Sequence, residues 1–407
     1  MNAPGDWAQY RRDVPATASC IYLNAGWSGP LPVQVAEAMR AWLDDELRLG
    51  PTRRELMERA REAKARYREL FAALLGALPE EIAVMENTTE GINVVVNGLG
   101  LQPGDVILTT NVEHPSGLVP AYVQRERRGC EVRIVDLEGV ESREEVLERF
   151  RAALDGRVKL VLISELSYLT GLWIPLREVV ELAHAAGARV LVDGAQSAGH
   201  IPLDVRATDV DFYALTAHKW LCGPDGIGAL YVRQDLIPGL EPVKVAGRAA
   251  RRWDTRGAFE PERELITKFE LTTVSALLVA GANAALERYL TAGADAILAR
   301  IRELHDRARA LLAAIPSVTL LTPGAPELRA GLLSFRIDSL PFGSARVAAG
   351  TLQRRWGIVC RSLPGLDGIR FSIHAYNTEE ELERAAEAVE ELARGGLPED
   401  AVAEFGE

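Results

Sequence analysis

Short apolar runs alternate with amphipathic stretches along residues 82–232. The apolar runs predict strands at 82–86, 105–110, 131–136, 158–163, 189–193, 210–215 and 228–232. The stretches between them predict helices near 88–98, 115–128, 142–154 and 176–186. Strands and helices in this order are typical of βαβ units. We therefore expect an α/β fold with a large domain whose mainly parallel sheet lies between helices.

The pattern changes after residue 240. Residues 240–264 are rich in Arg, Pro and Gly and show no clear period, which predicts a crossover or an active-site loop. Two long helices follow, and then strands and helices mix, which predicts a smaller α+β domain: helices 275–290, 294–314, 344–355 and 378–394, and strands near 318–321, 331–337, 357–361 and 369–373. We place the large domain at 20–262 and the small domain at 263–407, joined by the N-terminal segment 1–19.

Composition narrows the classes of partner. The net charge of −12 over 407 residues argues against nucleic acid or an anionic membrane as the main partner. No apolar run approaches the ~18 residues of a membrane span, and the N-terminus has no signal pattern. The four cysteines show no metal-ligand spacing: Cys20, Cys130, Cys222 and Cys360. We expect free thiols, no metal site and a cytoplasmic protein.

Two buried strands are expected to deliver reactive groups to one edge of the sheet. The run ending at Asp193 is followed by Gln196, and the run ending near Leu215 is followed by Thr216, His218 and Lys219. Ligands bind at the carboxyl edge of such sheets. A lysine for a Schiff base and an acid for the pyridinium nitrogen are what pyridoxal 5′-phosphate requires. The sequence therefore predicts a pyridoxal phosphate enzyme.

The scarcity of lysine strengthens this assignment. A Schiff base needs an amine that can lose its proton, which arginine cannot do. Lysine occurs only at positions 64, 159, 219, 244 and 268. We expect Lys64 on a solvated helix face, and only Lys219 follows a buried strand beside other reactive groups.

Four further motifs have both a functional and an ordinary interpretation. Thr88 and Thr89 open a helix whose N-terminus can bind phosphate, or this segment is a simple helix cap with Asn87 or Thr88 as the N-cap residue. His114, at a loop tip, can stack on a flat ring and relay protons, or it has no such duty. Arg370 and Arg361 can grip a carboxylate, or they are ordinary arginines. The arginines of the irregular segment either face the site or lie on a solvated loop: Arg248, Arg251, Arg252, Arg256 and Arg263.

Several blocks in order along residues 20–395 together resemble the class V aminotransferase family of fold-type I pyridoxal phosphate enzymes. The blocks are Asn87-Thr-Thr-Glu-Gly, Glu113-His-Pro, Asp193-Gly-Ala-Gln, Thr216-Ala-His-Lys, Gly223-Pro-Asp-Gly-Ile-Gly, Phe269-Glu-Leu-Thr-Thr and Ile369-Arg-Phe-Ser-Ile-His-Ala-Tyr-Asn. The opening Tyr22-Leu-Asn-Ala-Gly-Trp-Ser-Gly-Pro-Leu-Pro and Trp220 look most similar to the cysteine/cystine C–S lyases and the isopenicillin N epimerase-like proteins.

The resemblance implies a role for each matching residue. Thr88, Thr89, Thr216 and His218 would contact the phosphate, and His114 would stack over the ring. Asp193 would pair with the pyridine nitrogen, Gln196 with the 3′-oxygen, and Lys219 would form the Schiff base. Asn24, Arg361 and Arg370 would bind the substrate. Thr273 matches a threonine that completes the phosphate site of the partner subunit, which implies a homodimer.

The resemblance leaves the reaction open. Cysteine desulfurases carry a nucleophilic cysteine on a loop before the carboxylate-binding arginine, whereas the interval Arg361–Arg370 is short and holds none. We expect Cys360 to pack elsewhere and Cys222 to lie outside the nucleophile position. The favoured reaction is C–S β-elimination, in which Lys219 removes the α-proton and pyruvate and ammonia form. Epimerisation with His114 as the second proton donor, transamination, and a non-enzymatic cofactor-binding protein are the alternatives.

Overall fold

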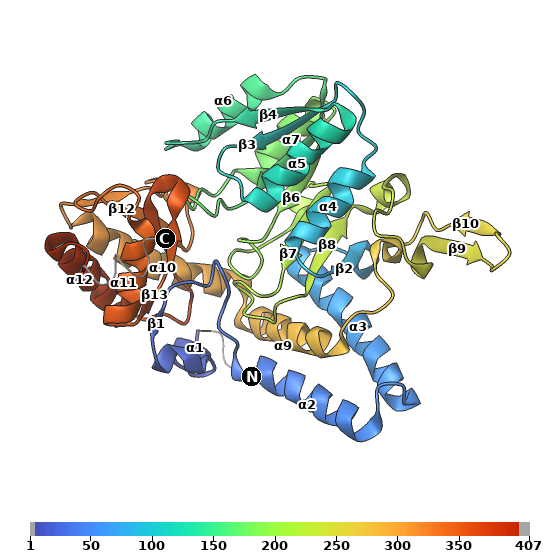
Figure 1. The fold of residues 1–407 in the computed structure, drawn as a ribbon, viewed down its shortest axis with the longest axis horizontal. Helices are drawn as coiled ribbons and strands as arrows, with labels where there is room; N and C mark the ends of the chain where they lie inside the picture. The colour runs from blue at the N-terminus through green and yellow to red at the C-terminus, as the bar shows by residue number, and fades with distance from the viewer. Residues whose placement is uncertain (1–4, 399–407) are drawn as a thin grey trace.

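A seven-stranded sheet forms the centre of the larger part of the molecule, within residues 5–398, which are the residues that the computed structural model describes (Figure 1). Its strand order is β2-β8-β7-β6-β5-β3-β4. The strands are β2 (Ile82–Met85), β3 (Val106–Thr110), β4 (Glu131–Val135), β5 (Val158–Ser164), β6 (Arg189–Asp193), β7 (Phe212–Thr216) and β8 (Gly228–Val232). Only β8 runs antiparallel to its neighbours, because a short loop and no helical crossover joins it to β7. The expected α/β fold with a mainly parallel sheet is confirmed.

Side chains alternate between the two faces of this sheet, and both faces are covered. On β5, Leu160 and Leu162 enter the core under α4 (Thr88–Gly98), whereas Val161 and Ile163 enter the core under α7 (Leu176–Ala185). The helices α5 (Pro115–Arg128), α3 (Arg54–Leu75) and α6 (Arg143–Ala153) complete the two layers. Burial on both faces explains why these strands are continuous apolar runs in the sequence.

A second core forms around the four-stranded sheet β11-β12-β15-β14 (Figure 1). Its elements are β11 (Val318–Leu320), β12 (Leu332–Ile337), β14 (Arg361–Leu363), β15 (Gly368–Ser372), α10 (Ala294–Ala313), α11 (Ala345–Trp356) and α12 (Glu379–Gly395). This part confirms the smaller α+β unit. The helix α9 (Ala276–Ala292) packs on α3 and on α2 (Val33–Leu49) and joins the core of the large sheet. The expected boundary between the large and the small domain, at residues 262/263, stays a prediction. Residues 1–4 and 399–407, which belong to the expected N-terminal segment and small domain, lie outside the described range.

The N-terminal segment links the two parts. It begins with α1 (Trp7–Arg12), and β1 (Ile21–Tyr22) then pairs in parallel with β13 (Ile358–Val359). Beyond β1, Asn24 forms a β-bridge with Ser372 of β15. The segment therefore crosses from the small sheet toward the carboxyl edge of the large sheet.

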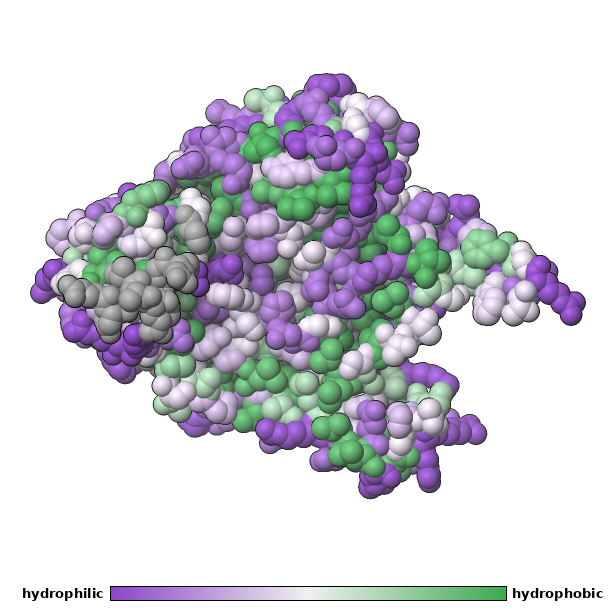
Figure 2. Space-filling view, in the orientation of Figure 1, coloured by the Kyte–Doolittle hydropathy of each residue, from purple (hydrophilic) through white to green (hydrophobic). Residues whose placement is uncertain are grey.

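Two features differ from the pattern expected of the sequence. Helix α2 was not among the expected elements, and α3 was expected only as the charged helix that carries Lys64, because charged residues dominate both and α2 buries only Val35 and Trp42. The segment expected to be irregular contains the hairpin β9 (Ala250–Trp253) and β10 (Phe259–Pro261), which projects from the body (Figure 1). Figure 2 shows apolar surface where this hairpin leaves the body.

None of the helices in the described range combines the length and apolar character that crossing a bilayer requires.

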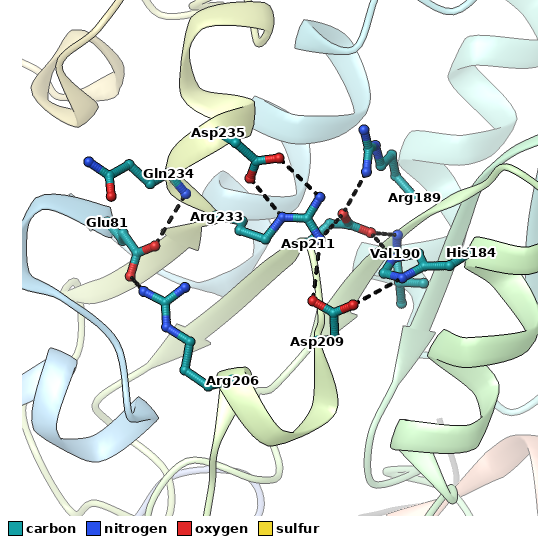
Figure 3. A network of polar contacts seen from close by, with 10 residues as sticks. All are labelled: Glu81, His184, Arg189, Val190, Arg206, Asp209, Asp211, Arg233, Gln234 and Asp235. Atoms are coloured by element: carbon teal, nitrogen blue, oxygen red, sulfur yellow. Dashed lines mark hydrogen bonds and ion pairs between the residues drawn. The ribbon is translucent and has the colours of Figure 1, made fainter.

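Buried Asp211, at the start of β7, gathers partners from three neighbouring elements (Figure 3). Its carboxylate accepts hydrogen bonds from the backbone N–H of Val190 on β6 (2.8 Å) and from Arg189 (3.2 Å), and lies 2.8 Å from His184 Nε2 of α7. Arg233, just after β8, forms an ion pair with it at 3.1 Å. A buried carboxylate is stable only with such partners. This network fixes the amino ends of the parallel strands, opposite the edge where ligands bind.

Replacing Asp211 with Ala should lower the free energy of unfolding by about 2–4 kcal/mol, because the Val190 N–H and the flanking cations lose their buried acceptor. Urea denaturation of the apoprotein measures the change. Asp235→Asn is the matched control, since Asp235 also pairs with Arg233 but its side chain is 63% exposed. We expect that control to change stability by about 0.5 kcal/mol or less. Equal effects of the two variants would contradict a fixing role for Asp211.

Candidate active site

A cavity of about 350 Å³ opens at the carboxyl ends of the parallel strands, a volume suited to a small molecule. Its walls come from the β2–α4 connection, the loop before α5, the ends of β6 and β7, and the N-terminal segment. The lining residues are Trp27, Asn87, Thr88, Thr89, His114, Ser116, Ser164, Tyr168, Asp193, Ala195, Gln196, Thr216, His218, Lys219 and Arg361. The structure thus brings together nine of the expected site residues from five separate segments.

Lys219 differs from the other lysines in having no partner. Lys64 pairs with Glu270 and Lys244 with Glu90, while Lys159 and Lys268 donate to backbone carbonyls. The expectation of a solvated Lys64 was wrong, because its amine meets the fully buried Glu270 carboxylate. Within residues 5–398, the side-chain amine of Lys219 has no hydrogen bond and no ion pair. Burial lowers the pKa of this amine to about 8, and the negative charge of Asp193 opposes that shift. A substantial fraction of this amine is therefore unprotonated and nucleophilic near neutral pH.

Asp193 is the buried acid of the site. One carboxylate oxygen accepts the backbone N–H of Ala195 at 3.0 Å, and burial raises the pKa of the carboxyl while the Lys219 charge opposes that shift. The Asp193 carboxylate has no other hydrogen bond within residues 5–398, so it has room for a cationic partner. A pyridinium nitrogen meets that requirement.

The amino end of α4 supplies groups for an anion. The Asn87 side chain caps the helix by accepting the Glu90 N–H at 3.0 Å, and the next residues, Thr88 and Thr89, line the cavity. The Thr88 hydroxyl is buried without a partner. At the end of β7, Thr216 Oγ1 lies 2.7 Å from His218 Nδ1. Free N–H groups, hydroxyls and an imidazole at a helix N-terminus suit a phosphate.

His114 caps α5 and remains neutral. Its Nδ1 accepts the Ser116 N–H at 3.2 Å, and its ring meets Tyr168 edge-to-face with centroids 4.9 Å apart. Burial is the main cause that lowers the pKa of His114, to about 4, and the positive charges of Lys219, Arg361 and Arg370 add to it. The preceding Glu113 anchors the loop, since it accepts the Ser164 N–H (2.8 Å) from the end of β5.

The second arginine expected in the site lies outside the cavity lining. Arg370 is fully buried on β15; its Nη1 donates to the Tyr168 carbonyl at 2.8 Å, and its Nε and Nη2 have no partner. Asn24 Oδ1 and Ser372 Oγ are also unpartnered. A Cβ on Gly26 would lie 2.8 Å from Ser372 Oγ and 2.9 Å from Arg370 Nη2. The unpaired donors of Arg370 and Ser372 form a cradle suited to a small anion such as a carboxylate, whereas Asn24 Oδ1 is an acceptor and needs a donor.

Two aromatic residues that were not expected in the site hold Arg361 at the cavity. The Arg361 guanidinium lies 4.5 Å from the Trp27 ring centroid and 6.0 Å from that of Tyr168. Tyr168 lies on the loop after β5, and its position beyond a parallel strand was the signal that could have indicated it. Trp27 belongs to an irregular segment whose path no local pattern specifies.

The remaining expected residues lie apart from the cavity of the same chain. Thr273 is exposed, between the turn Ile266–Phe269 and α9. None of the five arginines of the hairpin region lines the cavity, and Arg248 instead pairs with Glu270. Among the described residues, no group of three or more His, Cys, Asp or Glu side chains is placed to hold a metal ion.

Comparison with known proteins gives consistent matches. A family model described as Aminotransferase class-V matches residues 21–385. A probable cysteine desulfurase of Methanothermobacter thermautotrophicus is 31% identical over 404 residues, covering 95% of this chain and 98% of the relative. The isopenicillin N epimerase of Streptomyces clavuligerus is 33% identical, covering 96% and 99%.

Solved structures agree with these relatives. The cystine C–S lyase C-DES in complex with its reaction product, cysteine persulfide, superposes with a TM-score of 0.87 at 30% identity, covering 93% of this chain and 99% of that one. A lysine-to-alanine mutant of C-DES with glycine covalently linked to its pyridoxal phosphate cofactor gives a TM-score of 0.86 at 30% identity, covering 93% and 98%.

Lys219 should capture pyridoxal 5′-phosphate at a rate that follows its neutral fraction. With a pKa of about 8, the rate of capture by the apoprotein rises about tenfold between pH 7 and pH 9 and then levels off. Stopped-flow absorbance at each pH measures the rate. An ordinary lysine would give a rate that still climbs at pH 10, which would contradict the shifted pKa. Lys219→Ala should show no capture, whereas Lys159→Ala should behave as the unaltered protein does.

Proposed function

The chain belongs to the class V aminotransferase family, and from that premise we propose that it is a C–S β-lyase that cleaves cystine or cysteine. As a member of this family it is an enzyme that uses pyridoxal 5′-phosphate and acts on an amino acid. Sequence relatives include both desulfurases and an epimerase, so the choice of reaction depends on the residues of the cavity.

The observation that carries the proposal is that no thiol lines the cavity. The connection from Arg361 to Arg370 is a tight β14–β15 hairpin without cysteine. Burial raises the pKa of Cys222 to about 11 and that of Cys360 to about 12, so neither sulfur is a ready nucleophile. A desulfurase that passes sulfur to its own cysteine is therefore disfavoured, whereas β-elimination needs no such group.

The four cysteines are free thiols, which supports a cytoplasmic location; this location stays a prediction.

The cavity offers partners for both the phosphate group and the pyridine nitrogen of the cofactor. Thr88, Thr89, Thr216 and His218 would hold the phosphate, and Asp193 would keep the pyridine nitrogen protonated. When bound, pyridoxal phosphate supplies an aldehyde that takes the substrate amino group and a ring that withdraws electrons from the α-carbon. Three observations support this fit. The Thr88 hydroxyl is buried without a partner, the Asp193 carboxylate accepts one hydrogen bond, and the Lys219 amine has no partner.

Substrate orientation follows from the cradle around Gly26. Arg370 would bind the α-carboxylate with its free Nε and Nη2, because a bidentate pair satisfies two buried donors at once. Burial and the neighbouring Arg361 charge lower the pKa of Arg370 to about 9, so the guanidinium still carries its charge near neutral pH and a bound anion would stabilise that charge. Asn24 and Arg361 would complete the binding site.

Lys219 would then act as the base. Its amine takes the α-proton, the Cβ–S bond breaks, and the sulfur leaves with the bonding electron pair. With cystine and one water, the products are pyruvate, ammonia and cysteine persulfide, in which the S–S bond is kept. C-DES, a cystine C–S lyase with cysteine persulfide as its product, is the precedent among the similar structures.

Epimerisation is the alternative favoured by the Streptomyces clavuligerus relative. It needs a proton donor on the face of the substrate opposite Lys219, and His114 is the candidate. The pKa of about 4 leaves His114 neutral at physiological pH, and its Nδ1 already accepts the Ser116 N–H. A neutral imidazole is a weak acid, which favours elimination. No lining residue specifically supports transamination or a purely binding role.

The lyase proposal is tested with purified, cofactor-loaded protein and L-cystine or L-cysteine. We expect multiple turnovers of pyruvate, measured by coupling to lactate dehydrogenase, and one persulfide per pyruvate from cystine. Lys219→Ala should lower the rate at least about 10³-fold, as loss of a general base does, with Lys159→Ala as the matched lysine control. Formation of D-amino acid without pyruvate, measured by chiral chromatography, would replace the proposal with epimerisation.

We also propose a homodimer in which the partner's Thr273 completes the phosphate site. Thr273 is exposed and outside the cavity of its own chain. Exposed apolar residues also lie on the β9–β10 hairpin and on the chain segments that flank it, namely Val243, Val245, Trp253, Phe259 and Leu265. Apolar surface of this kind near a functional residue is typical of an interface.

Subunit mixing tests this arrangement. Thr273→Ala should weaken cofactor binding about tenfold, the value of one phosphate hydrogen bond. A hybrid dimer of a Thr273→Ala subunit and a Lys219→Ala subunit should regain one site of full affinity, because that site combines an intact lysine with the partner's intact threonine. Titration of the hybrid with pyridoxal phosphate measures the recovery. A hybrid that keeps only weak sites, or a monomer by light scattering, would contradict the proposal.

A further inference from the structure

The side-chain amide of Gln196 is fixed in one orientation by two groups of opposite character. Its Oε1 accepts the Trp220 indole N–H at 2.9 Å, and its Nε2 donates to the Gly26 carbonyl at 2.8 Å. An indole nitrogen can only donate and a backbone carbonyl can only accept. The amide therefore cannot be turned over without losing both bonds, and the second N–H is the one donor of this amide left for a ligand.

Gln196 lines the cavity with this fixed donor. The orientation selects what can lie opposite, since the remaining N–H requires an acceptor. The phenolate oxygen of the cofactor is such an acceptor. A glutamine with a freely rotating amide would present its oxygen part of the time, and two acceptors facing each other would repel.

Trp220 is itself held firmly. Its ring stacks on His200 with centroids 3.6 Å apart and planes 14° apart, and its carbonyl accepts a hydrogen bond from His374 Nε2 at 2.9 Å. Gly199 has a φ of +86°, and a Cβ there would lie 2.5 Å from the Leu221 N, so only glycine lets the two segments approach this closely. The Trp220 side chain is thus only 1% exposed, and this packing fixes the direction in which its indole N–H points.

His200 ties the same unit to the Gln196 backbone. Its Nδ1 donates to the Gln196 carbonyl at 2.9 Å, while its Nε2 accepts the Gly331 N–H at 2.7 Å. Burial lowers the pKa of His200, and separately that of His374, to about 3, so both rings that flank Trp220 are neutral. The stack acts through shape and hydrogen bonds rather than through charge.

From this geometry we propose that Trp220 is a positioning residue of the cofactor site, which locks Gln196 so that its amide N–H donates to the phenolate oxygen. The indole does not touch the cavity, and its effect passes entirely through the Gln196 amide. The inference depends on cofactor binding alone and holds whether the enzyme catalyses elimination or epimerisation.

A spectroscopic titration reads out this role. A donor to the phenolate stabilises its negative charge and so lowers the pKa of the proton shared between that oxygen and Lys219. Trp220→Phe keeps an aromatic ring on His200 but removes the N–H. We expect the pH midpoint of the visible absorption change of the bound cofactor to rise by about half a unit, and cofactor affinity to fall a few-fold.

The decisive step is the same change in a Gln196→Leu background. If Trp220 acts through Gln196, Gln196→Leu alone raises the midpoint, and adding Trp220→Phe raises it no further. Trp356→Phe, a change on α11 outside the cavity lining, is the matched control and should leave the midpoint unchanged. A Trp220→Phe protein with an unchanged midpoint, or a shift that persists undiminished without Gln196, would overturn the proposal.

A second variant covers failure of Trp220→Phe to fold. Site-specific replacement of Trp220 with benzothienylalanine keeps the shape and stacking of the ring and exchanges only the N–H for sulfur. The same upward shift is expected, and its absence overturns the proposal. Thermal unfolding of the apoprotein separates loss of packing from loss of the hydrogen bond, because a purely structural role lowers the melting temperature and leaves the midpoint in place.

Discussion

The parallel pairing of β6 with β7 is the constraint on which the active site depends. Its register places Asp193 opposite Ala214, so the acid at the end of one strand lies beside the segment that continues to Thr216 and Lys219. The strands between are buried on both faces and cannot shift without exposing apolar side chains. At their other end, the Asp211 network fixes the same pair. At the amino ends of β6 and β7 the buried polar groups are thus paired, whereas the carboxyl ends of the two strands line the cavity.

The cavity at these carboxyl ends is cationic, in an acidic protein. The whole chain has a net charge of −12, yet the charges of Arg361 and Arg370 act on Lys219, which lies near the buried acid Asp193. These three positive charges contribute to the depressed pKa of His114 and, from the arginines, to that of Lys219. The site therefore favours anions, and a phosphate and a carboxylate would each meet orphaned donors.

The sequence was most informative where local pattern and burial coincide. Continuous apolar runs ending in Asp193 or Thr216 predicted the strands and the edge that they share, and the scarcity of lysine singled out Lys219. Trp27 could not be found in this way, since its place depends on an irregular segment whose course is set by distant contacts such as Arg361, whereas Tyr168 follows the end of β5 and could have been indicated by that position. Helix α2 was missed, and α3 was expected only as the charged helix that carries Lys64, because charged residues obscure their narrow apolar stripes. Arg370 was named as a carboxylate-binding arginine from its residue type and from the resemblance, but only the structure shows it outside the cavity lining with unpaired donors.

The N-terminal segment gives this enzyme an unusual order of assembly. Its strand β1 pairs with β13, Asn24 bridges to Ser372, and the Gly29 N–H donates to the His218 carbonyl at 2.7 Å. The first part of the wall to leave the ribosome thus finds its β-partners only after residues 358–372 have been synthesised. A nascent chain can complete the large sheet long before then, but it lacks the side of the cavity that Trp27 and Gly26 provide. The wall of the cavity is consequently complete only when the N-terminal segment has paired with residues 358–372.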